Sequence, residues 1–146
     1  MKISTKGRYA LNIMVDIAKN AGQEKYISLT EIANRLKLSN KYLEQIISPL
    51  NKAGLVLSTR GNNGGYMLSR KPEEYKVGDI LRATEGNLAP ITCLSDGSAK
   101  KCPRKNQCTT LSFWQGLDKA IEEYVDSKSL QDLVNETKST KKYVLK

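Results

Sequence analysis

Three cysteines, Cys93, Cys102 and Cys108, give this sequence its most distinctive chemistry. They have eight and five residues between them and lie in one stretch without hydrophobic periodicity. Thiolates on an irregular loop can converge on a soft metal, and iron–sulfur clusters are held by thiolates. Four cationic residues of the same stretch favour the thiolate form: Lys100, Lys101, Arg104 and Lys105. The spacing predicts a thiolate metal site. Three unligated surface thiols are the alternative, because ordinary cluster sites use four cysteines.

Histidine is absent from the chain, which excludes several kinds of site. Catalysis by Ser-His or Cys-His pairs needs an imidazole, and so do the zinc motifs that use histidine. We find no other pairing of a nucleophile with a base, so the sequence predicts that the chain is not an enzyme. An odd number of cysteines also argues against a disulfide framework.

Positive charge is concentrated in the first half of the chain. The net charge is +9, and residues 1–71 hold twelve Lys and Arg against four Asp and Glu, whereas residues 72–146 hold twelve against eleven. Such a concentration is typical of a protein that binds a polyanion, because each neutralised phosphate releases counterions. The alternative is a basic protein with no nucleic-acid role. We find no Lys-rich amphipathic helix in the sequence, so the pattern does not favour binding to a membrane surface.

The N-terminal region and the hydropathy pattern bear on location. No apolar run approaches the ~20 residues that span a bilayer. Residues 1–20 lack the pattern of a secretory signal. We therefore expect a cytoplasmic protein without a membrane partner.

Two predicted helices open the chain. Apolar residues recur at helical spacing over residues 9–19, and Ser4 or Thr5 can cap that helix. A short second helix follows, because the run from Ser28 to Glu31 fits a capping box in which each side chain pairs with the other's backbone.

A third predicted helix starts after a tight connection. Ser39 can cap it, and Gly54 closes it. Pro49 predicts a kink or a restart of this helix near Ser48. Its apolar positions share one face: Leu43, Ile46, Ile47 and Leu50.

A β-hairpin is predicted directly after these helices. Residues 55–60 and 66–68 are rich in strand formers, and three Gly and two Asn lie between them in residues 61–65. Those residue types tolerate the positive φ of a hairpin tip. Tyr26 and Ile27 are predicted to form a further short strand.

The second half of the chain contains a long predicted helix. A short helix spans residues 77–85, and residues 87–107 form an irregular loop. Thr109 or Thr110 then caps a helix over residues 110–125 that keeps its apolar spacing, and one short turn follows at residues 129–134. This helix has an apolar face that must be buried, either on its own domain or on a partner: Trp114, Leu117, Ile121 and Tyr124.

The sequence therefore predicts a mainly α fold with a small β-hairpin wing (α+β), namely a winged helix-turn-helix followed by a long helix. Because this helix lies beyond a loop, burial of its apolar face on a partner is favoured, and we name it the dimerisation helix. The expected units are a DNA-binding domain (1–86), a cysteine-bearing loop (87–108), a dimerisation helix region (109–134) and a basic, disordered tail (135–146).

The helix that opens at Ser39 is the one that would enter a major groove with its N-terminal residues leading. It presents Ser39, Asn40, Lys41, Tyr42, Glu44 and Gln45. Hydroxyl, amide and ammonium groups suit phosphates, and Lys41 also suits a guanine edge. Glu44 either accepts a hydrogen bond from a cytosine amino group or pairs with Lys41 along the helix.

The wing supplies the other predicted DNA contacts: Arg60, Gly61 and Asn62. The Arg60 guanidinium either lies in a narrow minor groove or is an ordinary exposed cation. Gly64 and Gly65 serve the turn rather than a phosphate loop, because no helix follows them.

Several of these segments resemble the Rrf-type winged-helix regulators, which include the IscR, NsrR and CymR branches. The matching segments are MKISTKGRYA, YLEQ, AGLV, RGNNGGY and VGDI, at residues 1–10, 42–45, 53–56, 60–66 and 77–80. The resemblance extends to about Val134. It implies a homodimer paired through the long helix, bound to a pseudo-palindromic operator in double-stranded DNA. It also implies that Glu44 reads bases and that Arg60 reaches the minor groove.

The resemblance to the IscR branch implies a 2Fe-2S cluster on Cys93, Cys102 and Cys108. The IscR pattern ends in Cys-x-x-His, whereas this chain has Cys108-Thr109-Thr110-Leu111, and the NsrR branch uses an Asp where this chain has Arg8. The fourth ligand stays open among Asp96, Thr109, Thr110, Ser112, a partner-chain group and solvent. The CymR branch resembles the N-terminal half equally well, lacks the three cysteines, and controls sulfur metabolism through a partner enzyme.

Three hypotheses follow. The first is a transcriptional regulator, a repressor, that senses iron–sulfur or redox status through the cluster. The second is a cluster-free regulator of cysteine or sulfur metabolism, or a thiol redox sensor, that acts through a protein partner such as a sulfur-metabolism enzyme. The third is an electron carrier, which the basic first half and the predicted recognition helix argue against.

Overall fold

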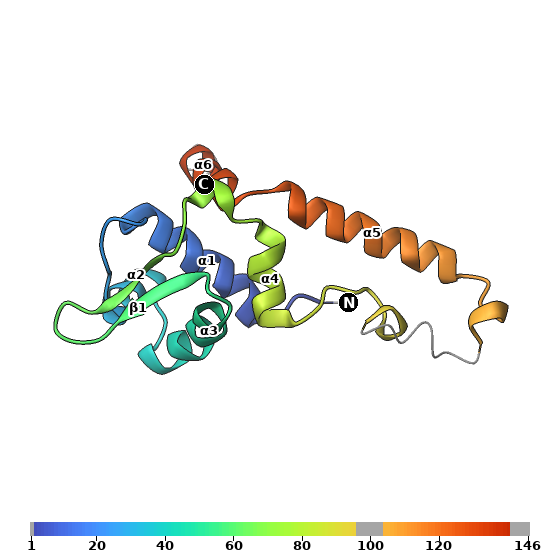
Figure 1. The fold of residues 1–146 in the computed structure, drawn as a ribbon, viewed down its shortest axis with the longest axis horizontal. Helices are drawn as coiled ribbons and strands as arrows, with labels where there is room; N and C mark the ends of the chain where they lie inside the picture. Colours follow the sequence, from blue (N-terminus) through green and yellow to red (C-terminus); the bar gives the residue numbers. More distant parts are fainter. Residues whose placement is uncertain (1, 96–103, 141–146) are drawn as a thin grey trace, which may run out of the picture.

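The structure is a computed structural model that describes residues 2–95 and 104–140 (Figure 1). Along the chain, the helices and strands are α1 (Thr5–Asn20), α2 (Leu29–Leu36), α3 (Asn40–Lys52), β1 (Val56–Thr59), β2 (Gly65–Leu68), α4 (Val77–Glu85), α5 (Leu111–Ser127) and α6 (Leu130–Thr140). Short 3-10 turns lie at Pro72–Glu74, Thr92–Leu94 and Lys105–Gln107. The two strands form an antiparallel hairpin that pairs Val56 with Leu68 and Thr59 with Gly65. The predicted mainly α fold with a hairpin wing is confirmed.

Serine side chains start the first three helices. Ser4 accepts a hydrogen bond from the Gly7 amide, Ser28 from the Glu31 amide and Ser39 from the Tyr42 amide, each at 3.1 Å. A serine in this position satisfies an amide that has no partner inside its helix. The predicted serine caps are therefore confirmed, although α1 begins at Thr5, four residues before the predicted start. Two other predicted caps do not form among the described residues: the Glu31 side chain does not return a hydrogen bond to the Ser28 amide, and Thr110 makes no side-chain cap at the start of α5.

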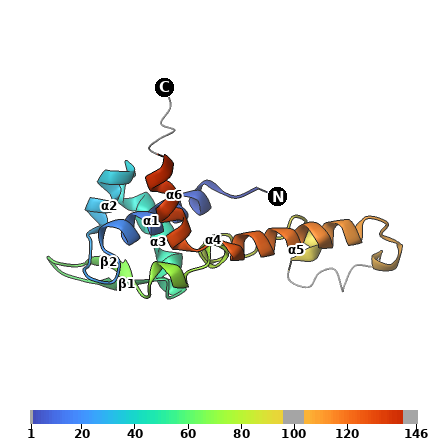
Figure 2. The same cartoon turned by 90° about the horizontal axis from the view of Figure 1, so that it is seen from above.

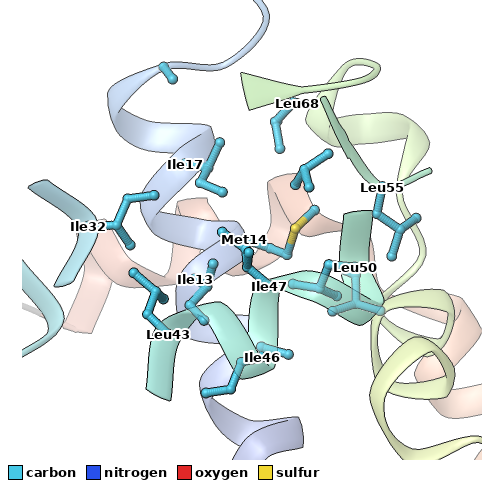
Figure 3. Packing of buried hydrophobic residues seen from close by; sticks show 14 of the residues in the cluster. Ile13, Met14, Ile17, Ile32, Leu43, Ile46, Ile47, Leu50, Leu55 and Leu68 are labelled. Carbon is cyan, nitrogen blue, oxygen red and sulfur yellow. The ribbon is translucent and has the colours of Figure 1, made fainter. Parts of the chain in front are cut away.

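The core lies between α1, α2, α3 and the hairpin (Figure 3). Its aliphatic side chains point toward one another, and burial of each stabilises the fold by about 1.5–3 kcal/mol. The labelled members are Ile13, Met14, Ile17, Ile32, Leu43, Ile46, Ile47, Leu50, Leu55 and Leu68. Because α3 uses its predicted apolar face here, the opposite face is left outside the core.

Helix α3 does not restart at Ser48, so the predicted restart is wrong, whereas the alternative of a kink near Ser48 stays a prediction. The helix runs through Pro49 to Lys52. A proline inside a helix removes one backbone hydrogen bond. Burial of Ile46, Ile47 and Leu50 around it outweighs this loss, because tertiary packing supplies most of a helix's stability.

Helix α6 corrects the prediction of a disordered tail from residue 135. The helix continues to Thr140 and packs on α1, with Leu130 and Val134 buried (Figure 2). The Leu130 amide also donates to the Tyr75 carbonyl at 3.0 Å. The end of the predicted dimerisation region therefore returns to the winged unit, which is the unit formed by α1 to α4 and the hairpin. Residues 141–146 lie outside the described residues.

Helix α5 leaves this unit and projects away from it (Figures 1 and 2). It spans 17 residues and has no buried residue. Near its C-terminal end, Ile121 and Val125 pack on a second small cluster formed by Val77, Leu81 and Leu88. Of the helices that the structure describes, none is both long and apolar enough to cross a membrane.

Candidate nucleic-acid interface

The first turns of α3 are open to solvent, as a DNA-reading helix requires. Ser39, Asn40, Lys41, Glu44 and Gln45 are all exposed. The Asn40 side-chain amide lies 3.4 Å from the Thr30 hydroxyl at the start of α2, so the two helix N-termini adjoin. Free amides at helix N-termini suit phosphate oxygens. The structure therefore gathers five of the six predicted α3 residues on one accessible surface.

Tyr42, the sixth predicted α3 residue, is turned partly toward the protein interior. It is half-buried, and its ring makes an edge-to-face contact with Tyr9 of α1, with centroids 5.9 Å apart and planes at 89°. Such a pair prefers this geometry. Tyr42 therefore holds the N-terminal half of α3 against α1.

Glu44 presents a carboxylate without a cationic partner among the described residues. No Lys or Arg nitrogen among the described side chains of residues 2–95, 104 and 106–136 is paired with it within 4.0 Å, so the predicted alternative of a Lys41 pair does not form. Its charge is felt by Tyr66 of the wing, whose pKa is raised first by burial and then by Glu44. An exposed carboxylate on this surface is available to a base amino group.

The wing is anchored beside the start of α2. The Ile27 amide donates to the Tyr66 carbonyl at 3.0 Å, and the Tyr66 amide donates back at 2.8 Å, which reduces the predicted 26–27 strand to one bridge. Gly65 has φ +153°, and a Cβ there would lie 1.9 Å from the Ile27 carbonyl oxygen. Only glycine permits this approach.

The wing tip carries the three predicted contacts. Arg60, Gly61 and Asn62 are exposed and follow directly after β1. The turn is closed by the Gly64 amide, which donates to the Gly61 carbonyl at 3.0 Å, and Gly61 has φ +107°. The tip can therefore approach a duplex closely without losing its internal hydrogen bond.

Tyr75 holds the base of the wing, and the sequence interpretation missed it. It is 1% exposed, and its hydroxyl donates to the Leu55 carbonyl at 2.6 Å and accepts from the Ser69 amide at 2.9 Å. The Arg70 guanidinium lies over its ring, 4.7 Å from the centroid. The only sequence signal is an aromatic residue inside an otherwise polar segment.

A partly buried ion pair joins α1 to α2. Asp16 is 8% exposed, and both its oxygens accept from the Arg35 guanidinium at 2.8 Å. A bidentate pair fixes orientation as well as distance. It sets the position of α2, against which α3 packs.

The free face of α5 carries large apolar side chains. Phe113 is 64% exposed, Leu117 36% and Tyr124 65%. Trp114 is half-buried and makes an edge contact with Phe113, with centroids 5.0 Å apart. Ile121, from the predicted dimerisation set, instead packs within its own chain. Phe113 was missed, although its four-residue spacing from Leu117 follows the helical period.

The cysteine loop is described in part. Cys93 is half-buried in the turn Thr92–Leu94, and Cys108 is exposed, with its Sγ 3.9 Å from the Thr110 hydroxyl. Cys102 and Asp96 lie outside the described residues. Within the described part of the chain, no group of three or more Cys, Asp or Glu could hold a metal ion.

Residues 3–136 match the Rrf2 family, which is described as an iron-dependent transcriptional regulator. This chain belongs to the Rrf2 family. The match spans the winged unit, the cysteine loop, α5 and most of α6, so it confirms the resemblance found in the sequence. As an Rrf2-family member, the chain is a DNA-binding transcriptional regulator and not an enzyme.

Two branches of the Rrf2 family are similar to this member. It is 44% identical over 137 residues to the HTH-type transcriptional regulator CymR of Bacillus subtilis, covering 94% of this chain and 92% of that protein. It is 39% identical over 134 residues to the HTH-type transcriptional regulator IscR of Aliivibrio salmonicida, covering 92% and 77%. Two of the three branches named from the sequence, CymR and IscR, are therefore represented.

Solved Rrf2-family structures confirm the architecture. CymR (YrzC), the global cysteine regulator of B. subtilis, superposes with a TM-score of 0.73 at 43% identity, covering 93% of this chain and 98% of that chain. IscR of T. potens superposes with a TM-score of 0.71 at 42% identity, covering 94% and 88%.

Proposed function

We propose that this Rrf2-family chain is a homodimeric repressor that binds a pseudo-palindromic operator in double-stranded DNA. One observation carries the proposal. The outward face of the N-terminal half of α3 is exposed and adjoins a glycine-tipped wing, while the opposite face of α3 is used by the core. A helix held in this way can enter a groove without disturbing the fold.

The α3 residues have distinct roles in this proposal. Ser39, Asn40 and the free amides of the first turn bind phosphate oxygens and set the register of the helix. Lys41 binds a phosphate or a guanine edge. Glu44 accepts from a cytosine amino group, and Gln45 reads a neighbouring base edge. Tyr42 supports this surface through its contact with Tyr9.

The wing reaches the next groove. Arg60 places its guanidinium in a narrow minor groove, where the negative potential is strongest. Gly61 and Asn62 bring the tip close to the sugar–phosphate backbone. The anchoring of the wing through Ile27 and Tyr66 keeps Arg60 at a constant distance from α3.

The exposed apolar stripe on α5 supports the homodimer. Phe113, Leu117 and Tyr124 lie on a helix that projects beyond its own winged unit, and Trp114 adjoins them. Removing such side chains from water is favourable by roughly 25 cal/mol per Å2 of apolar area, and this gain opposes the entropy that association costs. A second copy presents the same stripe, so pairing through a two-fold axis covers both.

Selection from a random duplex pool, combined with sedimentation analysis, tests this function. We expect a dimer that selects a site with two-fold related half-sites centred one helical turn, about 34–36 Å, or a multiple apart. A monomer that selects a single half-site, or a protein that enriches no sequence, contradicts the proposal.

We further propose that Cys93, Cys102 and Cys108 hold a 2Fe-2S cluster through which the regulator senses iron–sulfur or redox status. The donor chemistry fits: thiolates are the preferred ligands of such clusters, and the Thr110 hydroxyl lies beside Cys108. Thr109, Thr110 and Ser112 supply candidate oxygen ligands, alongside Asp96, a partner-chain group and solvent. When bound, the cluster supplies sensitivity to iron supply and oxidants. The iron dependence in the family's description supports this proposal.

Anaerobic purification with iron and sulfide counts tests the cluster. We expect about two irons and two sulfides per chain, with visible absorption that Cys102→Ala abolishes. Ser95→Ala is the matched control within the same loop and keeps the colour. Colourless, iron-free protein refutes the cluster and leaves the DNA-binding proposal untouched.

The similarity to CymR favours a second candidate. Here the chain is a cluster-free regulator of cysteine or sulfur metabolism that responds through its thiols or through a partner such as a sulfur-metabolism enzyme. This candidate predicts iron-free protein whose operator affinity changes with a thiol oxidant and recovers with a reductant. A Cys108→Ser variant that responds to oxidant as strongly as the parent argues against the exposed thiol as the sensor.

A further inference from the structure

Helix α5 is held to the winged unit at two places. Directly after its last turn, the Val77 amide donates to the Lys128 carbonyl at 2.9 Å, and along its last turns α5 makes a small and close side-chain contact with α4. Ile121 and Val125 pack against the apolar side chains of α4. At Gly78 of α4, a Cβ would lie 2.1 Å from the Asp126 Oδ1 and 2.9 Å from a Val125 methyl carbon. The α5 side chains therefore close directly over Gly78, so a larger residue there would displace the Asp126 carboxylate. The apolar part of this contact does not by itself fix the angle between the two helices.

Arg82 of α4 lies at the centre of this contact and binds two carboxylates of α5. Its Nη1 and Nη2 are each 3.0 Å from one oxygen of Asp126, and Nη2 also pairs with Glu122. A third carboxylate, Asp79, lies on α4 itself at 3.3 Å. The Arg82 side chain is 27% exposed, so the pair is partly shielded from solvent.

The electrostatics agree with this geometry. Hydrogen bonding to Asp126 and Glu122 raises the pKa of Arg82. Hydrogen bonding to Arg82 holds the pKa of Asp126 below its ordinary value. Glu122 and Asp126 are one helical turn apart on α5. Because the planar Arg82 guanidinium binds both carboxylates, it fixes the rotation and the tilt of α5 as well as its distance from α4.

A change of tilt at this point is amplified along α5. Beyond the contact, α5 continues from Ile121 back to Leu111, about 15 Å at 1.5 Å per residue. A 10° change of tilt therefore moves the far end by about 3 Å, close to the 3.4 Å rise of one base pair. In a dimer paired through α5, the same change also moves the two α3 helices relative to each other.

We propose that Arg82 is a positioning residue that sets the operator spacing by fixing the angle at which α5 leaves the winged unit. This inference rests on the proposed dimer paired through α5. Arg82 touches no DNA in this account. It acts on the distance between the two half-sites that the dimer can bind at once.

Operators with altered spacing test this role. The parent dimer is measured against the selected operator and against versions with one base pair inserted or removed between the half-sites. The parent should prefer one spacing by about 5- to 150-fold, the range of an ordinary coupling between sites. In Arg82→Gln the preference should fall below about threefold, mainly by weaker binding to the natural spacing, while sedimentation still shows a dimer.

Matched variants separate positioning from general damage. Asp79→Asn removes the one carboxylate partner that does not belong to α5, and should keep the parental spacing profile. Arg82→Lys keeps the charge but not the fork, and should give an intermediate profile. If Arg82→Gln fails to fold, Asp126→Asn carries the test, because Arg82 then keeps only Glu122 on α5.

The results that overturn the proposal are distinct from those that overturn the function. A folded Arg82→Gln or Asp126→Asn dimer with the parental spacing profile refutes the positioning role alone. A parent protein that is monomeric, or that binds one half-site regardless of spacing, refutes the proposed dimeric function and this inference with it.

Discussion

Replacing Tyr75 with Phe removes one hydroxyl from the base of the wing and changes nothing else in the side chain. That hydroxyl donates to the Leu55 carbonyl at 2.6 Å and accepts from the Ser69 amide at 2.9 Å and the Arg70 amide at 3.3 Å. Leu55 is 3% exposed, so water does not replace the lost donor. The ring itself, with its contact to Arg70, stays in place.

The expected cost follows from these partners. A buried carbonyl left without a donor costs about 1–3 kcal/mol, and each hydrogen bond lost at the half-buried Ser69 and Arg70 amides costs about 0.5–1.5 kcal/mol. Together we expect Tyr75→Phe to lower the free energy of unfolding by about 3 kcal/mol. For a chain of this size, each kcal/mol shifts Tm by about 2–4 °C, so the expected fall is about 6–12 °C.

Urea unfolding followed by circular dichroism measures this change, with Tyr26→Phe as the matched control. Tyr26 is exposed, so its variant should stay within about 0.5 kcal/mol of the parent. If Tyr75→Phe also stays within that range, the hydroxyl does not hold the base of the wing, and the reasoning is wrong.

Three other outcomes follow from the same structure. Log affinity for the operator should fall linearly with log salt, by about 0.9 per phosphate contact, and a flat salt titration would contradict an interface of phosphate contacts. Gly65→Ala should weaken operator binding, because its Cβ would overlap the Ile27 carbonyl, and binding equal to that of the parent would count against the wing anchor. Arg82 holds the pKa of Asp126 below its ordinary 3.8, so this pair stabilises the fold fully above that pH and less as the pH falls through the lower, folded value. Relative to Asp126→Asn, the parent should therefore lose stability below about pH 4 in acid-dependent unfolding, and parallel curves would contradict the pairing.

Local rules predicted the winged unit well. Ser4, Ser28 and Ser39 cap their helices as expected, since an N-cap depends only on residues within one turn. The helix predicted at residues 77–85 has those bounds in the structure, ending before Gly86. The hairpin was predicted from its strand formers and its glycine-rich tip, which are also local signals.

Contacts between distant segments left no such signal. Asp16 and Arg35 are 19 positions apart, and Arg82 and Asp126 are 44 apart, so each looks like a solvated surface charge in the sequence. Tyr75 joins the wing to α6 through partners on both sides of it. Long-range polar pairing of this kind depends on the fold and becomes visible only once the elements are placed.

The candidate sites were predicted to different degrees. Except for the half-buried Tyr42, the predicted α3 and wing residues are all exposed, because their positions follow directly from local elements. On α5, periodicity finds an apolar face but does not distinguish burial on the same chain from burial on a partner. Ile121 packs on α4, whereas Phe113 is exposed, although both fit the helical period.

The base preference of a Glu44→Ala variant tests the central claim most directly, namely that the outward face of α3 reads DNA. Affinities are measured for a panel of duplexes in which each half-site position is changed in turn, with Lys41→Ala as the matched control. The parent should reject the wrong base at the Glu44 position by about 1–3 kcal/mol. Glu44→Ala should lose that discrimination at one position per half-site and keep it elsewhere. Where Lys41 binds a phosphate, Lys41→Ala should weaken binding to all sequences alike. A Glu44→Ala variant that loses affinity uniformly, or that keeps the full parental preference, contradicts the account.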